Sequence, residues 1–263
     1  MGHVRVGRLP KKWGWEQVIS ALSSESALGG EGETDFVSRA ARAADRTLSD
    51  AKHQESVALA YWTFIDLAAA SRSGDLLVRL REQGAQIPER PTGLTLLKLI
   101  SATLERSVRA KGASSGLDEI ALQTFDAVVL TTARSGSETL FGCSVESVQT
   151  AFRELSTKAG VANIGRRFFS EYTFRALRLA LEKELARSLG KGGRFSTSNE
   201  LARFEERLKT YCWDVSKIVQ DYSGGWYSKA LWEQRLTLAE AQNFTSYAIQ
   251  KLLSELSREP PPL

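Results

Sequence analysis

The sequence predicts an all-α protein, a compact array of about nine to eleven helices, and three observations support this class. Apolar residues recur at helical spacing in nearly every long segment of the 263-residue chain. Several of these segments begin with residue patterns that start helices, and several end at glycine. Strand patterns are sparse: residues 3–9, HVRVGRL, alternate apolar and basic side chains over a short span only.

The predicted helices follow one another with short connections. Residues 34–54 place Phe36, Ala40 and Leu48 along one stripe, and residues 56–71 are apolar on almost all sides, which is typical of a helix buried among others. Further helices are expected from Asp75 to near Gly84, at 93–112, 116–136, 143–160, 163–189, 197–223 and 226–232, and from 237 to the Pro260–Pro262 tail. The segment 163–189 is the longest of them.

Three predicted helix starts carry the capping-box pattern. In this pattern the side chain of Ser or Thr bonds the backbone N–H three residues later, and an acid at that position bonds back. The pairs are Ser115 with Asp118, Thr197 with Glu200, and Thr237 with Glu240. Asp75 is expected to cap the helix that begins beside it.

We divide the chain at its glycine- and serine-rich joints. Residues 1–15 form an extended N-terminal arm, 16–135 an N-terminal helical lobe, 143–258 a C-terminal helical lobe, and 259–263 a proline-rich tail. The two lobes can equally form one continuous domain.

The composition limits the classes of function. A 42% hydrophobic chain with a net charge of +4 has enough apolar residues for a core, and it attracts phosphate only where basic residues cluster. Cys143 and Cys212 have no CxxC or histidine neighbour, so we expect neither a metal site nor disulfides, and a reducing cytoplasm. The apolar run 57–70 is too short to cross a bilayer, and the first residues lack an apolar leader.

Motifs for catalysis are weak. Residues 112–116, GASSG, match a nucleophile-elbow pattern at Ser114, but a helix is predicted before them and both histidines come earlier in the chain. The glycines near Lys191 have the wrong spacing for a phosphate loop. Asp66 lies inside an apolar helix, so we expect it to pair with an arginine of a neighbouring helix. We therefore predict no enzyme activity, no cofactor and no metal.

The strongest charge pattern covers residues 166–194, with eight basic and three acidic residues. The candidate nucleic-acid-binding residues here are Arg166, Arg167, Arg175, Arg178, Arg187, Lys191 and Arg194. They could follow a phosphate backbone. In the alternative, Arg167, Arg175 and Arg178 pair with Glu171 and Glu182 along one helix face, while the interleaved aromatic residues are core.

The N-terminal arm is a second candidate. Arg5, Arg8, Lys11 and Lys12 precede Trp13 and Trp15. Basic residues beside tryptophan can bind nucleic acid, a membrane surface or an acidic protein face. The alternative is that the apolar side chains of the arm dock on the body of the protein.

The densest aromatic segment surrounds Gly224 and Gly225. We expect the two glycines to break the helix, so that Trp226 and Leu231 fold back onto the core. Lys229 and Trp232 are then candidates for exposure and for a cation–π contact. The candidate partner-binding residues are Trp13, Trp15, Trp226, Tyr227, Lys229 and Trp232.

These observations predict a non-enzymatic helical subunit or adaptor of a larger cytosolic, bacterial complex, which acts through a protein partner or a second copy of itself. The alternative is a DNA-binding protein that uses the Arg-rich helix and the basic arm.

Overall fold

The computed structural model describes Ser20, residues 43–44, 46–47, 49–50, 55–112, 115–134, 144–190 and 195–256. The N-terminal arm, the proline-rich tail, Ser114, Cys143, Lys191 and Arg194 lie outside the described residues. The described part of 43–50 is helical, as predicted for 34–54.

The all-α class is confirmed within the described residues, which contain no strand and a single isolated bridge between Leu189 and Phe195. The helices are α3 (Glu55–Ser73), α4 (Leu76–Glu82), α5 (Gly93–Ala110), α6 (Gly116–Arg134), α7 (Val145–Leu155), α8 (Lys158–Arg187), α9 (Ser198–Val215), α10 (Lys217–Trp232) and α11 (Leu238–Leu256). The predicted count of nine to eleven refers to the whole chain and stays a prediction.

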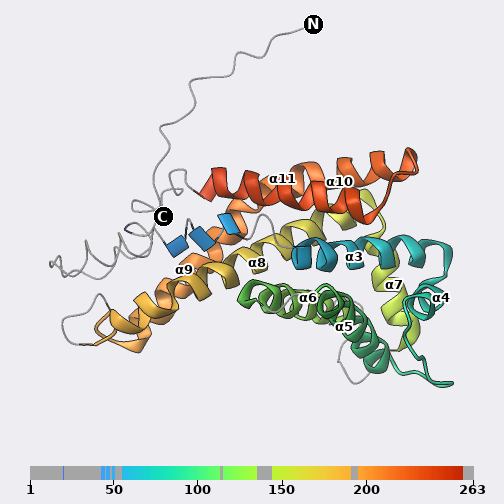
Figure 1. The fold of residues 1–263 in the computed structure, drawn as a ribbon, viewed down its shortest axis with the longest axis horizontal. Coiled ribbons are helices and arrows are strands. Elements are labelled where there is room, and N and C mark those ends of the chain that lie inside the picture. The colour runs from blue at the N-terminus through green and yellow to red at the C-terminus, as the bar shows by residue number, and fades with distance from the viewer. Residues whose placement is uncertain are drawn as a thin grey trace, which may run out of the picture.

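Two central helices organise the array. The 30-residue α8 runs diagonally through the molecule in Figure 1, and it packs most extensively against α10, then α9 and α6. Helix α3 packs against α11, α7, α6, α5 and α4. One buried cluster of apolar side chains extends from Ala44 to Leu256 and takes residues from every described helix. The boundary between the two lobes stays a prediction, and the core spans both ranges.

Aromatic side chains fill the centre between α3, α8, α10 and α11. The fully buried Tyr61 ring lies 5.3 Å from Phe169, 5.2 Å from Phe244 and 6.4 Å from Trp226, measured between ring centroids. Trp226 also stacks on Phe244 at 4.3 Å. Such pairs contribute about 0.5–1.5 kcal/mol each beyond the area that they bury. The expectation that Trp226 packs on the core is confirmed.

The predicted helix break at Gly224 and Gly225 is wrong. Helix α10 runs through both glycines, and the break falls at Ser216, between α9 and α10. Gly224 serves a close approach instead: a Cβ there would lie 2.5 Å from the backbone oxygen of Lys158, at the start of α8. A side chain at Gly225 would meet nothing within 4 Å. The missing Cβ at Gly224 therefore lets α10 cross α8 at close range.

Asp66 forms the predicted ion pair. Its carboxylate accepts from Arg79 on α4 at 2.7 Å and 3.0 Å, and from the amide of Gln83 at 2.7 Å. Asp66 is 9% exposed, so these three bonds offset the cost of removing its charge from water. They also fix α4 to α3.

The sequence located most helix starts correctly. The backbone N–H groups of Asp118, Glu200 and Glu240 bond the hydroxyls of Ser115, Thr197 and Thr237, each at 3.3 Å. Asp118 completes its capping box by accepting from the Ser115 backbone N–H at 2.8 Å. Asp75 is the residue before α4, but its side chain makes no capping bond. The longest helix begins five residues earlier than Asn163, because Thr157 caps it.

Candidate functional site

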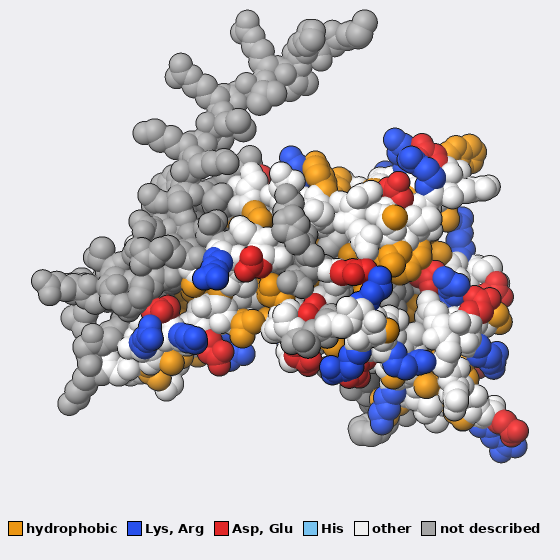
Figure 2. Space-filling view, in the orientation of Figure 1, with side chains coloured by type: hydrophobic (Ala, Val, Ile, Leu, Met, Phe, Trp, Pro, Cys, Tyr) orange, Lys and Arg blue, Asp and Glu red, His pale blue; other side chains and the backbone are white. Residues whose placement is uncertain are grey.

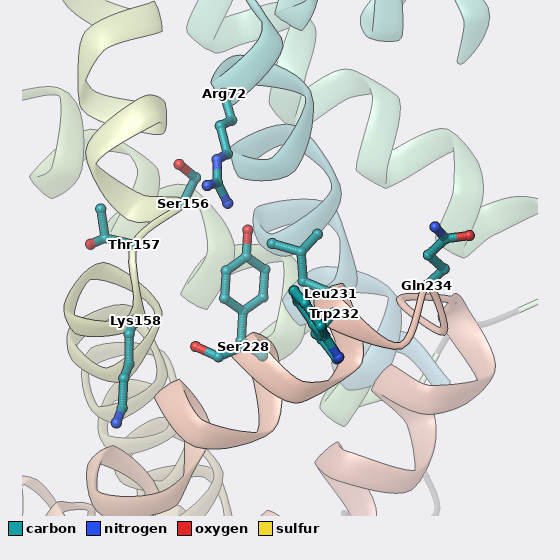
Figure 3. A pocket seen from close by; sticks show the side chains of 9 residues that line it. Arg72, Ser156, Thr157, Lys158, Ser228, Leu231, Trp232 and Gln234 are labelled. Atoms are coloured by element: carbon teal, nitrogen blue, oxygen red, sulfur yellow. The ribbon is translucent and has the colours of Figure 1, made fainter.

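A cleft of about 750 Å³ lies where the end of α3, the junction of α7 with α8, and the last two turns of α10 meet. Figure 3 shows Arg72 of α3 and the junction residues 156–158 on one side and the end of α10 on the other. Its lining consists of Arg72, Ser156, Thr157, Lys158, Tyr227, Ser228, Leu231, Trp232 and Gln234. This set contains two cations and several hydroxyls, and no carboxylate.

The first wall of the cleft is the N-terminus of α8. Thr157 adopts an extended conformation, and its hydroxyl accepts from the N–H of Gly160 at 2.9 Å. The turn from α7 is so tight that a Cβ at Gly160 would lie 2.3 Å from the backbone oxygen of Glu154. The start of a helix carries a partial positive charge from its aligned peptide dipoles. The backbone alone therefore makes this wall electropositive.

The two cations of the cleft have no acidic partner within the described residues. Arg72 and Lys158 are both exposed, and no hydrogen bond or ion pair of either side chain is present in that part of the chain. The acids nearest to them in sequence are Asp75, three residues after Arg72, and Glu154, four residues before Lys158, and neither forms an ion pair with them among the described residues. Glu233, beside Trp232, pairs with Arg235 on the connection to α11. The charge of the cleft is thus available to a ligand.

Tyr227 supplies a buried hydroxyl to the wall of the cleft. The residue is 2% exposed, and its hydroxyl has no hydrogen-bond partner among the described residues. Burial raises the pKa of Tyr227, while Arg72 acts on that pKa in the opposite direction. The phenol therefore keeps its proton at neutral pH and can act as a donor. A buried donor without an acceptor costs about 1–3 kcal/mol of stability.

Gln234 closes the cleft in an unusual backbone conformation. Its φ is 54°, the one positive φ of a non-glycine residue in the described chain. The N–H of Gln234 bonds the oxygen of Leu231 at 3.2 Å, and the N–H of Arg235 bonds that of Ala230 at 2.9 Å. This is the Schellman ending of a helix, in which glycine usually holds the left-handed position. Four other positive-φ positions, Gly74, Gly84, Gly112 and Gly190, do carry glycine.

The candidate partner-binding residues separate into core and surface. Tyr227 is buried and Trp226 is packed on the core, whereas Lys229 is exposed and Trp232 is 88% exposed. The described cation–π contacts are Arg166 over Trp213 and Lys251 over Tyr247, so the expected contact between Lys229 and Trp232 is absent from the described chain. Trp13 and Trp15 lie outside the described residues.

The arginines of α8 are mostly engaged with neighbours. Arg175 pairs with Glu171 at 2.9 Å, Arg178 with Glu205 of α9 at 2.9 Å, and Arg187 with Glu184 at 3.2 Å. The predicted pairing along one face is thus found for Arg175, while Arg178 reaches across to another helix instead of pairing with Glu182. Basic and acidic side chains alternate on the face drawn in Figure 2.

Arg166 is held more firmly than the others. Its guanidinium lies 4.1 Å from the centroid of the Trp213 ring, and it donates to the backbone oxygen of Trp213 and to Gln220. Arg167 is exposed and lines a second cleft of about 540 Å³ between α6, α8 and α9, together with Lys209, Trp213 and two glutamates. Lys191, Arg194, Arg5, Arg8, Lys11 and Lys12 lie outside the described residues.

Two classes of site have no counterpart in the described residues. No three His, Cys, Asp or Glu side chains there are grouped to hold a metal ion. None of the described helices combines the length and apolar character that a membrane crossing needs. Cys212 is fully buried, and burial raises the pKa of its thiol, so it is a poor nucleophile.

The sequence indicates one wall of the cleft and not the other. Tyr227 and Trp232 were candidate residues, whereas Arg72 and Lys158 were not, because α3 and the start of α8 meet α10 only in the folded chain. Gln234 was also missed, since its positive φ is not the usual choice of a non-glycine residue. The Thr157-Lys158 start of α8 was a detectable helix-cap signal. No protein-family model matches the chain, and no curated protein or solved structure matches it at a significant level.

Proposed function

We propose that this protein is a non-enzymatic helical subunit or adaptor of a larger cytosolic, bacterial complex, and that it binds a protein partner at the surface around Trp232. The observation that carries this proposal is the 88% exposure of Trp232 at the rim of the cleft. Tryptophan is strongly enriched at the energetic centres of protein interfaces.

Exposure of this one side chain has a measurable free-energy consequence. Burying a tryptophan removes about 150–250 Å² from water, which at ~25 cal/mol/Å² corresponds to an upper bound of about 4–6 kcal/mol. Nearby Leu231 is half-buried and the cleft lies beside it, so a partner can cover apolar and polar groups together. This combination is the usual anatomy of an interface core with a polar rim.

The proposal of a non-enzymatic role rests on the sequence. The chain has two histidines, no phosphate loop and no nucleophile with a base in a suitable order. A cytoplasmic location is part of the same proposal and is supported by the cysteine usage of the chain.

Site-specific photocrosslinking tests the proposal. A benzoylphenylalanine at position 232 is expected to capture one defined protein, or a second copy of the chain, in cells of the source organism. The same group at position 130 of α6, where Leu130 is also an exposed apolar residue, is the control and is expected to capture much less. Light scattering of the purified chain then distinguishes a homo-oligomer from a hetero-complex. A monomer without any product from position 232 contradicts the proposal.

The alternative function is DNA binding through the Arg-rich region and the basic arm. It is favoured by the exposed Arg167 beside Lys209 and Trp213, and by the concentration of basic residues in 166–194. It predicts a complex with duplex DNA whose affinity falls steeply with salt, with a smaller salt slope after neutralisation of Arg187, Lys191 and Arg194. A gel shift at low salt without any complex removes this alternative.

A further inference from the structure

We propose that the cleft at the N-terminus of α8 is an anion-binding site, which takes a carboxylate or phosphate group between Arg72, Lys158 and the hydroxyl of Tyr227. The anion site itself is a property of the free chain. Its natural carrier, an acidic or phosphorylated side chain of a protein segment, rests on the function proposed above.

Donors from three parts of the chain line this cleft, and Figure 3 shows the Lys158 ammonium directed away from Arg72, so the exposed Lys158 side chain would reach a shared anion through a different rotamer. Arg72 comes from the last turn of α3, Lys158 from the first residue of α8, and Tyr227 from α10. Arginine offers several N–H donors in a planar fork, which matches the oxygens of carboxylate and phosphate. The α8 terminus adds the partial positive charge and backbone N–H groups that favour anions at helix starts.

The buried hydroxyl distinguishes this helix start from an ordinary one. Tyr227 is 98% buried and keeps an unpartnered O–H in the wall of a cleft that holds two cations. Tyr227 belongs to the same buried cluster as Tyr61, whose hydroxyl also has no described partner, but Tyr227 lines the cleft and Tyr61 does not. An acceptor brought by a ligand would satisfy the Tyr227 donor, and none of the lining residues of the cleft is an acid that could compete for it.

The packing of the fold holds these donors in place. The start of α8 is seated against Gly224 of α10, where the absence of a Cβ allows the Lys158 backbone to approach. Ser228, one turn after Gly224, bonds the Gly224 oxygen at 2.9 Å and leaves its own side chain on the cleft wall. The donors therefore lie on three packed helices, α3, α8 and α10, which favours binding of a small ion.

The ligand is expected to carry apolar surface beside its charge. Leu231 and Trp232 line the same cleft as the two cations, and Trp232 is almost fully exposed. An anionic side chain on a peptide with an adjacent apolar residue fits both halves of this surface. The strained Gln234 lies at the same rim, and strained residues of this kind are enriched at functional sites.

An NMR titration of the full chain with inorganic phosphate, and separately with acetate, tests the site at constant ionic strength. We expect saturable shifts of the backbone amides at 157–160 and of the Arg72 side-chain N–H. Arg72→Gln and Lys158→Gln should each weaken binding about tenfold, because each removes one charge-assisted contact. Tyr227→Phe should weaken it about fivefold without lowering the unfolding temperature.

Lys183→Gln is the matched control, since Lys183 is an exposed cation of the same helix far from the cleft in sequence. The affinity of the Lys183→Gln variant for phosphate and for acetate should stay within about twofold of that of the parent chain. Saturation by both ions, or by phosphate alone, upholds the site and distinguishes a general anion site from a phosphate site. Shifts that rise linearly with either ion, or that persist in Arg72→Gln and Lys158→Gln, overturn it. A failed titration with successful crosslinking at position 232 removes the anion site and leaves the proposed function standing.

Discussion

The two ends of α8 use their basic residues in opposite ways. Along the second half of the helix, Arg175, Arg178 and Arg187 each contact a glutamate within 3.2 Å. At the first residue, Lys158 lines the same cleft as Arg72 and has no acidic partner among the described residues. The second half of α8 therefore carries more basic residues than the start of the helix, but more of its charge is neutralised by glutamates. A binding site depends on which charges stay unpaired, and the number of arginines in a segment does not reveal that.

The packing that places the N-terminus of α8 gives the largest expected effect. Gly224→Ala would put a Cβ 2.5 Å from the backbone oxygen of Lys158, so we expect it to destabilise the protein by about 3 kcal/mol. Gly225→Ala, one residue later at an exposed helical position with open space, should stabilise it by about 0.5–1 kcal/mol. Urea denaturation of both variants measures the two signs. A destabilisation of equal size in both variants would support the original prediction that the two glycines break the helix.

Breaking the buried ion pair of Asp66 should cost more stability than breaking the exposed ion pair of Arg178. Asp66→Ala removes the acceptor of three hydrogen bonds from Arg79 and Gln83, and we expect a loss of about 2–3 kcal/mol. Arg178→Ala breaks a pair in which the arginine is 61% exposed, and it should cost less than about 1 kcal/mol. Thermal and urea unfolding of both variants provide the comparison. A large loss for Arg178→Ala would show that the charges of α8 are structural supports.

Tyr227→Phe should separate stability from binding. It removes a buried hydroxyl that has no described partner, so the variant is expected to be about 1 kcal/mol more stable than the parent chain. The same change weakens anion binding in the proposed site. Calorimetry of the variant without added anion gives the stability. A marked loss of stability would mean that the hydroxyl is already bonded within the fold.

Gln234→Gly should have the smallest effect. Glycine adopts positive φ without strain, so the variant is expected to gain about 0.5–1 kcal/mol at the end of α10. If the Gln234 side chain contributes to the cleft, the stabilised variant should also capture less partner in the crosslinking experiment. Equal capture with higher stability would limit Gln234 to a helix-ending role.

The sequence predicted local structure well and spatial convergence poorly. Capping residues such as Ser115 and Thr197, and the paired acid Asp66, were predicted correctly because each depends on nearby residues or on a burial rule. The prediction of a helix break at Gly224 was wrong, because a glycine that permits a turn and one that permits close helix packing look the same in sequence. The sequence around Arg72 and Lys158 does not indicate a shared site, since only the packing of α3, α8 and α10 brings the two residues together.

A crystal structure of the full chain soaked with tungstate tests the central claim most directly, because the anomalous signal of tungsten locates the anion without interpretation. We expect a tungstate between Arg72 and Lys158, within hydrogen-bond distance of the Tyr227 hydroxyl. Tungstate bound along Arg175, Arg178 and Arg187, with an empty cleft, would contradict it.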